Sequence, residues 1–354
     1  MSEPTAPSEF RRAENPADLT PTLRHLLEGH TLTAEETTAA FTAMMSGEVH
    51  HGEMGALLAL LAIRTPTVEE LLGAARVMRS NVDPVTSSIS PEDLTDTAGT
   101  GGAPKTFNVS TAAAIIAAAA GARIAKHGNR SRTGRGSAEV LQALGVNVDA
   151  DRSTQQRCLE EVGVCFCFAI HHHPATRHVM PVRLALGVPT IFNLLGPLTN
   201  PAGARRQIMG VYAARFVDPI ANTLNALGSL RALVVHSDDG LDEISLSAST
   251  TVAHVKDGSI SHERVEPAAL GLAPAPHSAV VARDLEHAAD MVRGVIDGRL
   301  TGPPLDMTLL NTAGTLIAAG KAASFEEGVR IARETIERGA AAATLAGLRE
   351  CSNG

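Results

Sequence analysis

The chain has 354 residues and a formal net charge of −8, with 44% hydrophobic and 19% charged residues. A chain of this length and composition can bury a large core, and we expect two subdomains. Its aromatic content is 3%, with one Tyr and no Trp. The acidic balance and the few aromatic residues provide neither a broad basic face nor stacking platforms, so we expect no nucleic acid partner.

Location is indicated by three further properties. No apolar run reaches the length of a membrane span, so we expect no membrane association. Residues 1–19 are polar, rich in Pro, Glu and Ser and without a hydrophobic signal core, which predicts a disordered N-terminal extension. The cysteines lack metal-ligand spacing, which indicates free thiols in a reducing cytoplasm; they are Cys158, Cys165, Cys167 and Cys351.

Helix signals dominate residues 21–80. Thr20 and Pro21 open a first helix, and Gly47 can close a second one. Two capping-box patterns mark helix starts, Thr33 with Glu36 and Thr67 with Glu70. The sequence therefore predicts a block of helices, followed by a Pro- and Ser-rich linker over 81–92 that contains the interdomain hinge.

From Leu94 onward, extended and helical patterns alternate. The strand candidates are 123–126, 164–169, 207–212, 231–236 and 251–255. This alternation predicts a mainly parallel sheet with crossover helices. A second linker is expected over 271–277, and Ser324 with Glu327 caps a late helix that runs towards Arg338.

The first of two glycine-rich loops follows an extended run that ends at Asp96-Thr-Ala98. Gly99-Thr-Gly-Gly102 allows backbone N–H groups to turn inward, and Ser110 and Thr111 stand where a helix over 111–120 begins. Gly121 stops that helix. The N–H groups, helix dipole and hydroxyls that converge here suit phosphate oxygens or a metal that bridges them.

The second loop follows the strand candidate 123–126 and precedes a predicted helix over 138–144. It carries a cluster of cations that contrasts with the net charge of the chain: Lys126, Arg130, Arg132 and Arg135, together with His127 and Asn129. Strand-to-helix loops at the carboxyl edge of a parallel sheet are where open α/β folds bind ligands. Two such loops predict a site for an anionic ligand.

Ordered motifs over about residues 21 to 350 resemble the anthranilate phosphoribosyltransferase family. They are Asp96-Thr-Ala-Gly-Thr-Gly-Gly102, Asn108-Val-Ser-Thr111, Lys126-His-Gly-Asn-Arg-Ser131, His173-Pro174, Pro181-Val-Arg183, Phe192-Asn-Leu-Leu-Gly-Pro-Leu-Thr-Asn-Pro201 and Asp239-Gly-Leu-Asp-Glu243.

The resemblance implies an α/β fold like that of the nucleoside phosphorylases, with a small N-terminal helical domain and a larger α/β domain with a mainly parallel sheet. The implied boundaries are 20–90 and 91–350, with part of 193–204 returning to the helical domain, and the subunits are expected to form a homodimer. The implied reaction transfers the phosphoribosyl group of phosphoribosyl pyrophosphate to the amino nitrogen of anthranilate, with Mg²⁺ as cofactor. An aniline nitrogen is already nucleophilic, so no strong general base is required, and catalysis should be leaving-group stabilisation and positioning.

The resemblance also assigns residues to each ligand. For phosphoribosyl pyrophosphate they are Gly99, Gly102, Thr106, Asn108, Ser110, Thr111, Lys126 and Ser137. For anthranilate they are Gly99, His127, Asn129, His173, Arg183, Gly196 and Pro197. For Mg²⁺ they are Ser110, Asp242 and Glu243. A guanidinium fork fits a benzoate carboxylate, Lys126 suits a phosphate as a point charge, and Mg²⁺ prefers hard oxygen ligands.

Some readings stay open. His127 either orients the aromatic substrate or only satisfies its loop. The triplet His171, His172 and His173 is expected on an extended segment, where successive side chains point to opposite faces and disfavour a metal tract. The family usually has an acidic residue where this chain has Ala103, and the segments 103–105 and 132–135 each look one residue short. The extra cations Lys105, Arg132 and Arg135 suggest that side-chain charge holds the pyrophosphate instead.

Two other functions remain as alternatives. A pyrimidine nucleoside phosphorylase shares the two-domain architecture but binds orthophosphate and a nucleoside, without needing Asp242 and Glu243. A non-catalytic or nucleic-acid-binding protein of the same fold is the second alternative, and the charge and aromatic content argue against it.

Overall fold

The computed structural model describes residues 17–131 and 134–354. The expected disordered extension over 1–19 therefore lies, apart from residues 17–19, outside the described residues, as does Arg132. Within the described ranges no helix is long and apolar enough to cross a membrane.

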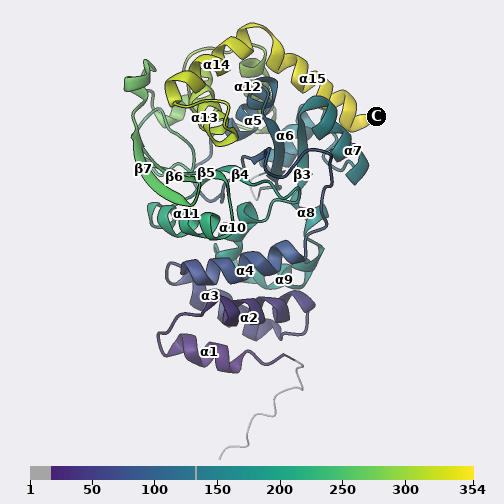
Figure 1. Cartoon of the computed structure of the whole chain (residues 1–354), viewed down its shortest axis with the longest axis vertical. Helices are drawn as coiled ribbons and strands as arrows, with labels where there is room; N and C mark the ends of the chain where they lie inside the picture. Colours follow the sequence, from purple (N-terminus) through teal and green to yellow (C-terminus); the bar gives the residue numbers. More distant parts are fainter. Residues whose placement is uncertain (1–16, 132–133) are drawn as a thin grey trace, which may run out of the picture.

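Four helices at the start of the chain form a block on one side of the sheet (Figure 1). They are α1 (Thr20–Leu27), α2 (Ala34–Ser46), α3 (His51–Ala62) and α4 (Val68–Ser80). Both predicted capping boxes are confirmed: each threonine side chain accepts from the backbone N–H three residues later, and each glutamate accepts from the threonine's backbone. Gly47 ends α2 with φ of +82°, as predicted.

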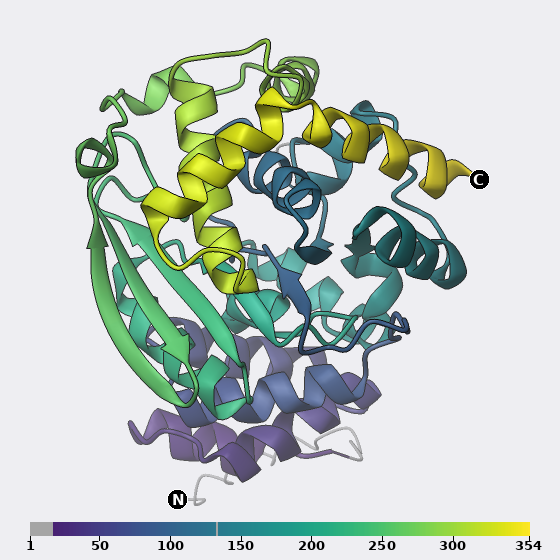
Figure 2. The same cartoon turned by 45° about the horizontal axis from the view of Figure 1, so that its top comes forward.

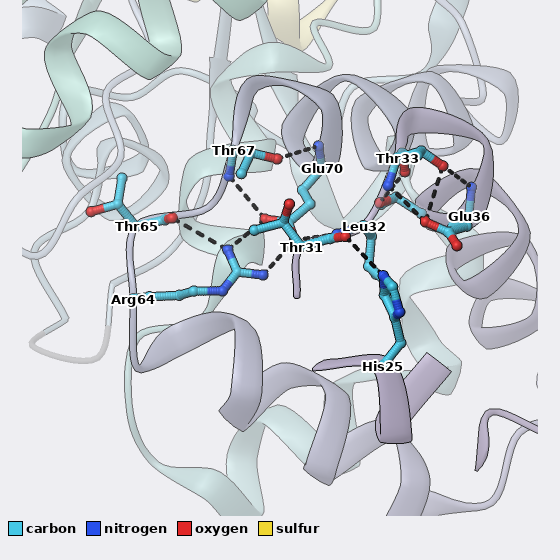
Figure 3. Close-up of polar contacts among 10 residues, drawn as sticks. His25, Thr31, Leu32, Thr33, Glu36, Arg64, Thr65, Thr67 and Glu70 are labelled. Atoms are coloured by element: carbon cyan, nitrogen blue, oxygen red, sulfur yellow. Dashed lines mark hydrogen bonds and ion pairs between the residues drawn. The ribbon is translucent and has the colours of Figure 1, made fainter. Parts of the chain in front are cut away.

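Glu70 is more than a cap for α4, as Figure 3 shows. Its side chain is fully buried and accepts hydrogen bonds from the backbone N–H groups of Leu32, at 3.0 Å, and Thr67, at 2.8 Å. The Arg64 guanidinium contacts both of its carboxylate oxygens. Burial acts to raise the pKa of this carboxyl, but the Arg64 and backbone hydrogen bonds outweigh it and leave the pKa lowered. One carboxylate thus joins the loop before α2 to the loop before α4.

We expect Glu70→Ala to lower the free energy of unfolding by about 3 kcal/mol, because a half-buried guanidinium and two backbone donors lose their partner. Urea unfolding measures this loss. Glu36→Ala is the matched control: it removes the corresponding capping-box glutamate of α2 at an exposed position and should cost about 1 kcal/mol. Equal losses in the two variants would contradict the special role of the buried pair.

The α/β part contains one seven-stranded sheet in the order β3-β2-β1-β4-β5-β6-β7. The strands are β1 (Leu94–Asp96), β2 (Arg123–Gly128), β3 (Val164–Phe168), β4 (Arg206–Gly210), β5 (Arg231–Ser237), β6 (Thr250–Lys256) and β7 (Ser259–Val265). The pairs from β3 to β5 are parallel, and β6 and β7 are antiparallel. The predicted mainly parallel sheet and its strand candidates are confirmed.

Strand β7 was not among the candidates. Most of its side chains are exposed and polar, because it forms the edge of the sheet, so no apolar alternation marks it. The available signal is Asp257-Gly258, where both residues have positive φ, of 49° and 81°. An Asp-Gly pair of this kind is typical of a tight hairpin turn.

Helices cover both faces of the sheet (Figures 1 and 2). One face carries α5 (Val109–Ala119), α6 (Ser137–Ala143), α7 (Arg152–Arg157), α12 (Leu285–Ile296), α13 (Pro303–Ala319), α14 (Phe325–Glu337) and α15 (Ala340–Asn353). The other carries α10 (Ile191–Leu195) and α11 (Val217–Ala226), with α1 to α4 beyond them. Side chains of β5 alternate between the two cores: Leu233 and Val235 enter the first, Ala232 and Val234 the second.

Helix α10 connects the first helices to the sheet. The Phe192 ring lies 5.7 Å from the Phe41 ring of α2, and Nε of Arg79 in α4 donates to the Leu198 carbonyl at 2.7 Å. The core on this face runs without interruption from the first helices into β4 and β5. The chain around Gly196 is therefore held between the helical block and the sheet.

Candidate functional site

The first glycine loop lies where the sheet reverses its order. From β1 the chain adds β2 and β3 on one side, whereas β4 pairs with the other side of β1. Open α/β sheets bind ligands at the carboxyl ends of strands at such a switch point. The loop bridges the two sides: Thr100 N donates to the Gly210 carbonyl at 2.9 Å, and Tyr212 N donates to Thr100 Oγ1 at 3.1 Å.

Glycine is required in this loop for shape and for space. Gly101 and Gly102 have φ of +62° and +96°, which favour glycine. A Cβ on Gly99 would stand 3.2 Å from the Gly210 carbonyl oxygen and 3.5 Å from Asp242 Oδ2. The first loop therefore lies against β4 and beside the predicted metal carboxylates.

Helix α5 begins at Val109, so Ser110 and Thr111 lie in its first turn, as predicted. Asn108 precedes the helix with φ of +70°, an uncommon conformation for a non-glycine residue that costs about 1 to 2 kcal/mol. Its Nδ2 donates to the Arg135 carbonyl at 3.2 Å, so it joins the two loops. The backbone directly before the N-terminus of α5 is therefore held by a contact between the first loop and the second.

The second loop begins at the end of β2 with two buried basic residues. Lys126 and His127 are each 4% exposed. Lys126 Nζ donates to Thr97 Oγ1 at 3.0 Å, next to the first loop. Burial lowers the pKa of Lys126 to about 8, while the charges of Asp96 and Glu243 act to raise it.

The rest of this loop folds back on itself. Ser137 opens α6, and its Oγ lies 3.4 Å from the carbonyl of the exposed Asn129. A Cβ on Gly128 would collide with Ser137. The guanidinium of Arg135 donates to the Ala282 carbonyl, so this cation is engaged with backbone.

Asp242 and Glu243 meet the first loop across a long stretch of sequence. Thr106 Oγ1 donates to Glu243 Oε2 at 2.9 Å, and the backbone N–H of Ser110 donates to the same carboxylate. Burial and the neighbouring charge of Asp242 raise the pKa of Glu243 to about 7, and burial also raises the pKa of Asp242. The positive charge of Lys105 opposes both increases. Gly210 is required beside them, since a Cβ there would collide with the Asp242 carbonyl.

This carboxylate pair fits Mg²⁺. Two adjacent carboxylates repel one another when both are ionised, and a bound divalent cation removes that repulsion. No group of three His, Cys, Asp or Glu side chains suited to a metal occurs in the described ranges. Mg²⁺ is usually held by one or two carboxylates, with substrate phosphates and water completing its shell.

The predicted residues for the aromatic substrate gather at the other end of the second loop. His127 Nε2 lies 3.2 Å from His173 Nε2, and the His127 ring also hydrogen-bonds the Gly196 backbone. Burial lowers the pKa of His127 well below its usual value and that of His173 to about 4, so both rings are neutral at pH 7. Pro197, which follows Gly196, is buried, and its carbonyl accepts a hydrogen bond from the Gln207 side chain.

Arg183 lies on α9 (Met180–Leu186), with its guanidinium 5.1 Å from the centre of the Phe192 ring. Phe192 belongs to α10, which leads into Gly196. Asn129 lies two residues beyond His127 and is exposed. Contacts within the described residues thus connect His127, His173 and Gly196 directly, and connect Arg183 to them through α10.

The predicted conformation of the histidine triplet is wrong. The chain turns into the short helix α8 (Ala169–His172) after β3, because His172 is drawn inward, where its Nδ1 hydrogen-bonds the Asp83 carbonyl at 2.8 Å. His171 Nε2 lies 2.7 Å from Asp149 Oδ1, so this ring has an acidic partner. The three rings have three different partners, and they form no metal tract.

Sequence reasoning assigned no role to Asp96, Thr100 or Tyr212. Asp96 had a recognisable signal, since it is the last residue of a strand directly before a glycine loop. The contacts of Thr100 and Tyr212 with each other become visible only when β4 is placed beside β1.

Known proteins are similar to this chain over most of its length. The family model described as "Glycosyl transferase family, helical bundle domain" matches residues 20–82, and the one described as "Glycosyl transferase family, a/b domain" matches residues 91–342. An anthranilate phosphoribosyltransferase from Rhodopseudomonas palustris (strain BisA53) is 47% identical over 327 residues, which cover 92% of this chain and 95% of the relative.

Solved structures agree. The crystal structure of anthranilate phosphoribosyltransferase from Thermus thermophilus has a TM-score of 0.88 at 39% identity and covers 94% of this chain and 99% of its own. The Saccharomyces cerevisiae enzyme in complex with PRPP and Mg has a TM-score of 0.85 at 27% identity, covering 95% and 98%.

Proposed function

The chain belongs to the anthranilate phosphoribosyltransferases and, like them, transfers the phosphoribosyl group of phosphoribosyl pyrophosphate to the amino nitrogen of anthranilate in tryptophan biosynthesis; we propose that the two glycine loops carry this reaction. The single observation that supports this site most is that both loops, Lys126 and the pair Asp242–Glu243 meet at the switch point of the sheet.

Phosphoribosyl pyrophosphate binds along the first loop and the start of α5. The backbone N–H groups of the glycine loop and the N-terminus of α5 offer donors to the phosphate oxygens, and Lys126 adds a point charge. The residues that we propose for this ligand are Gly99, Gly102, Thr106, Asn108, Ser110, Thr111, Lys126 and Ser137.

Asp242, Glu243 and Ser110 would hold Mg²⁺. When bound, the ion supplies charge neutralisation for the leaving pyrophosphate. Departure of pyrophosphate builds positive charge on the ribose and negative charge on the leaving group, so Lys126 and the loop N–H groups stabilise the charge that develops.

Anthranilate binds beyond the second loop. The neutral pair His127 and His173 contacts the ring and its amino group without competing for a proton, and Arg183 pairs with the carboxylate. Asn129 and the Gly196–Pro197 edge complete this side, and Gly99 contacts both substrates. The amine needs orientation more than activation, and no strong base is required.

Assembly and location form part of the proposal. Large apolar side chains are exposed on or next to α1, α3 and α9: Leu27 at 70%, Ile63 at 80% and Leu184 at 67%. These exposed apolar side chains support a homodimer through the helical domain, which light scattering of the purified protein tests. We place the domain boundary near residue 90, with part of 193–204 belonging to the helical side. The cytoplasm is supported by four cysteines that are all free in the described residues.

The reaction is tested by following anthranilate fluorescence. Its loss should require both phosphoribosyl pyrophosphate and Mg²⁺, and pyrophosphate should appear in equal amount. Phosphorolysis of uridine with orthophosphate, in place of this reaction, would contradict the proposed function.

The role of Lys126 predicts a pH dependence. Its pKa of about 8 means that the ammonium loses its proton as the pH rises through that value, so kcat/KM for phosphoribosyl pyrophosphate should fall about tenfold per pH unit above it. In Lys126→Arg the guanidinium stays charged over the whole pH range of the assay, so the decline should disappear even if activity is lower throughout. A decline that persists in this variant would assign it to another group.

A further inference from the structure

Asp96 is the last residue of β1 and is only 1% exposed. Its Oδ1 accepts three backbone hydrogen bonds: from Thr97 at 2.7 Å, from Ala98 at 3.1 Å and from His127 at 2.9 Å. Its Oδ2 is buried and has no hydrogen bond of ordinary geometry in the described ranges, and the nearby Asn200 side chain acts to lower the pKa of this carboxyl. This buried carboxylate therefore binds backbone N–H groups both of the segment after β1 and of β2.

The three donors belong to both loops. Thr97 and Ala98 lead directly into Gly99, whereas His127 follows Lys126 on β2. The backbone pairing of β1 with β2 is Leu94 with Arg123 and Thr95 with Ile124. The Asp96 carboxylate continues the connection past that pairing, to the point where the two ligand loops leave the sheet.

Lys126 connects to the same group. Its Nζ donates to Thr97 Oγ1, and Thr97 N donates to Asp96 Oδ1, so lysine, threonine and aspartate form one chain of contacts. Burial raises the pKa of Asp96 to about 6, against the Lys126 charge and the hydrogen bonds that lower it. The charges that face Lys126 are the Asp96 and Glu243 carboxylates, and the adjacent His127 ring is neutral.

We infer that Asp96 is a positioning residue of the reaction, which sets the distance between the first glycine loop and Lys126 and balances the lysine charge before phosphoribosyl pyrophosphate binds. This inference rests on the proposed role of Lys126. A neutral acceptor at position 96 would hold the loops but would remove one of the two carboxylates whose charges face the buried ammonium, and for this reason a carboxylate stands here.

Two variants separate these roles. Asp96→Asn keeps an acceptor for the backbone donors and removes the charge, whereas Asp96→Ala removes both. Thr95→Val is the matched control, because Thr95 is the preceding buried residue of the same strand and its hydroxyl has no partner in the described part of the chain.

For Asp96→Asn we expect kcat/KM for phosphoribosyl pyrophosphate at pH 7 to fall about tenfold. The pH above which kcat/KM declines should move about one unit lower, since a charge that raises the Lys126 pKa is gone. The KM for anthranilate at saturating phosphoribosyl pyrophosphate should change less than about twofold. Asp96→Ala should lose about a hundredfold, and Thr95→Val should match the parent.

An unmoved pH decline in Asp96→Asn, or equal losses for both substrates, would overturn the inference and leave Asp96 a purely structural residue. If Asp96→Ala does not fold, Asp96→Asn alone decides. Lys126→Met distinguishes a failure of the proposed phosphoribosyl pyrophosphate site from a failure of the role inferred for Asp96. A large rise in its KM for phosphoribosyl pyrophosphate supports the proposed site, so that a failure of the Asp96 variants counts against Asp96 only, whereas an unchanged KM overturns both.

Discussion

The double substitution Asp242→Asn with Glu243→Gln should lower kcat by at least about a thousandfold, because the leaving pyrophosphate loses its cation. The fold should survive. Both replacements keep the shape of the side chain, and the new amide oxygen at position 243 still accepts from Thr106. Because burial and mutual repulsion raise the pKa values of the two carboxyls, the metal-free variant should unfold at the same temperature as the parent or higher.

Calorimetric titration of Mg²⁺ in the presence of phosphoribosyl pyrophosphate checks the cause of the loss. Asp238→Asn with Asp239→Asn is the matched control, since it removes an adjacent acidic pair from the same loop. Those two side chains are exposed and engaged with Arg264 and with Ser245 and Ser247. Near-parental activity of the Asp242 and Glu243 variant at limiting Mg²⁺ would refute the metal assignment.

Local signals were sufficient for much of this fold. Capping boxes, glycines at helix ends and apolar strands bounded by turns act over a few residues, so α2, α4, α14 and most of the sheet were predictable from neighbouring residues alone. Strand β7 was missed by the prediction because an exposed edge strand carries no apolar alternation. The histidine triplet failed because its conformation depends on Asp83, a partner far away in the sequence.

The candidate site could likewise be predicted only in part from the sequence. The glycine loops and the helix start at Val109 could be located from residue types and order, since their geometry is made locally. The pairings could not. Thr106 and Glu243 are 137 positions apart, and Asp96 and His127 are 31 apart, so which donor meets which acceptor follows only from the order of the strands.

Arg183→Ala should raise the KM for anthranilate about ten- to a hundredfold, because a charge-assisted pair with a carboxylate contributes roughly 1.5 to 3 kcal/mol. The KM for phosphoribosyl pyrophosphate should stay within about threefold of the parent, since Arg183 belongs to α9, stacks on Phe192 and is not among the residues proposed for that substrate. Arg183→Lys should be intermediate: it keeps the charge but loses the planar fork and its stacking.

Aniline, which lacks the carboxylate, makes the assignment specific. The parent should prefer anthranilate to aniline strongly, and Arg183→Ala should lose most of that preference, because the two substrates then differ by a group with no partner. Arg177→Ala removes a nearby exposed arginine and should keep the parental preference. If Arg183→Ala weakens both amines equally, or raises both KM values together, the guanidinium supports α10 through its stacking on Phe192 and does not bind the carboxylate.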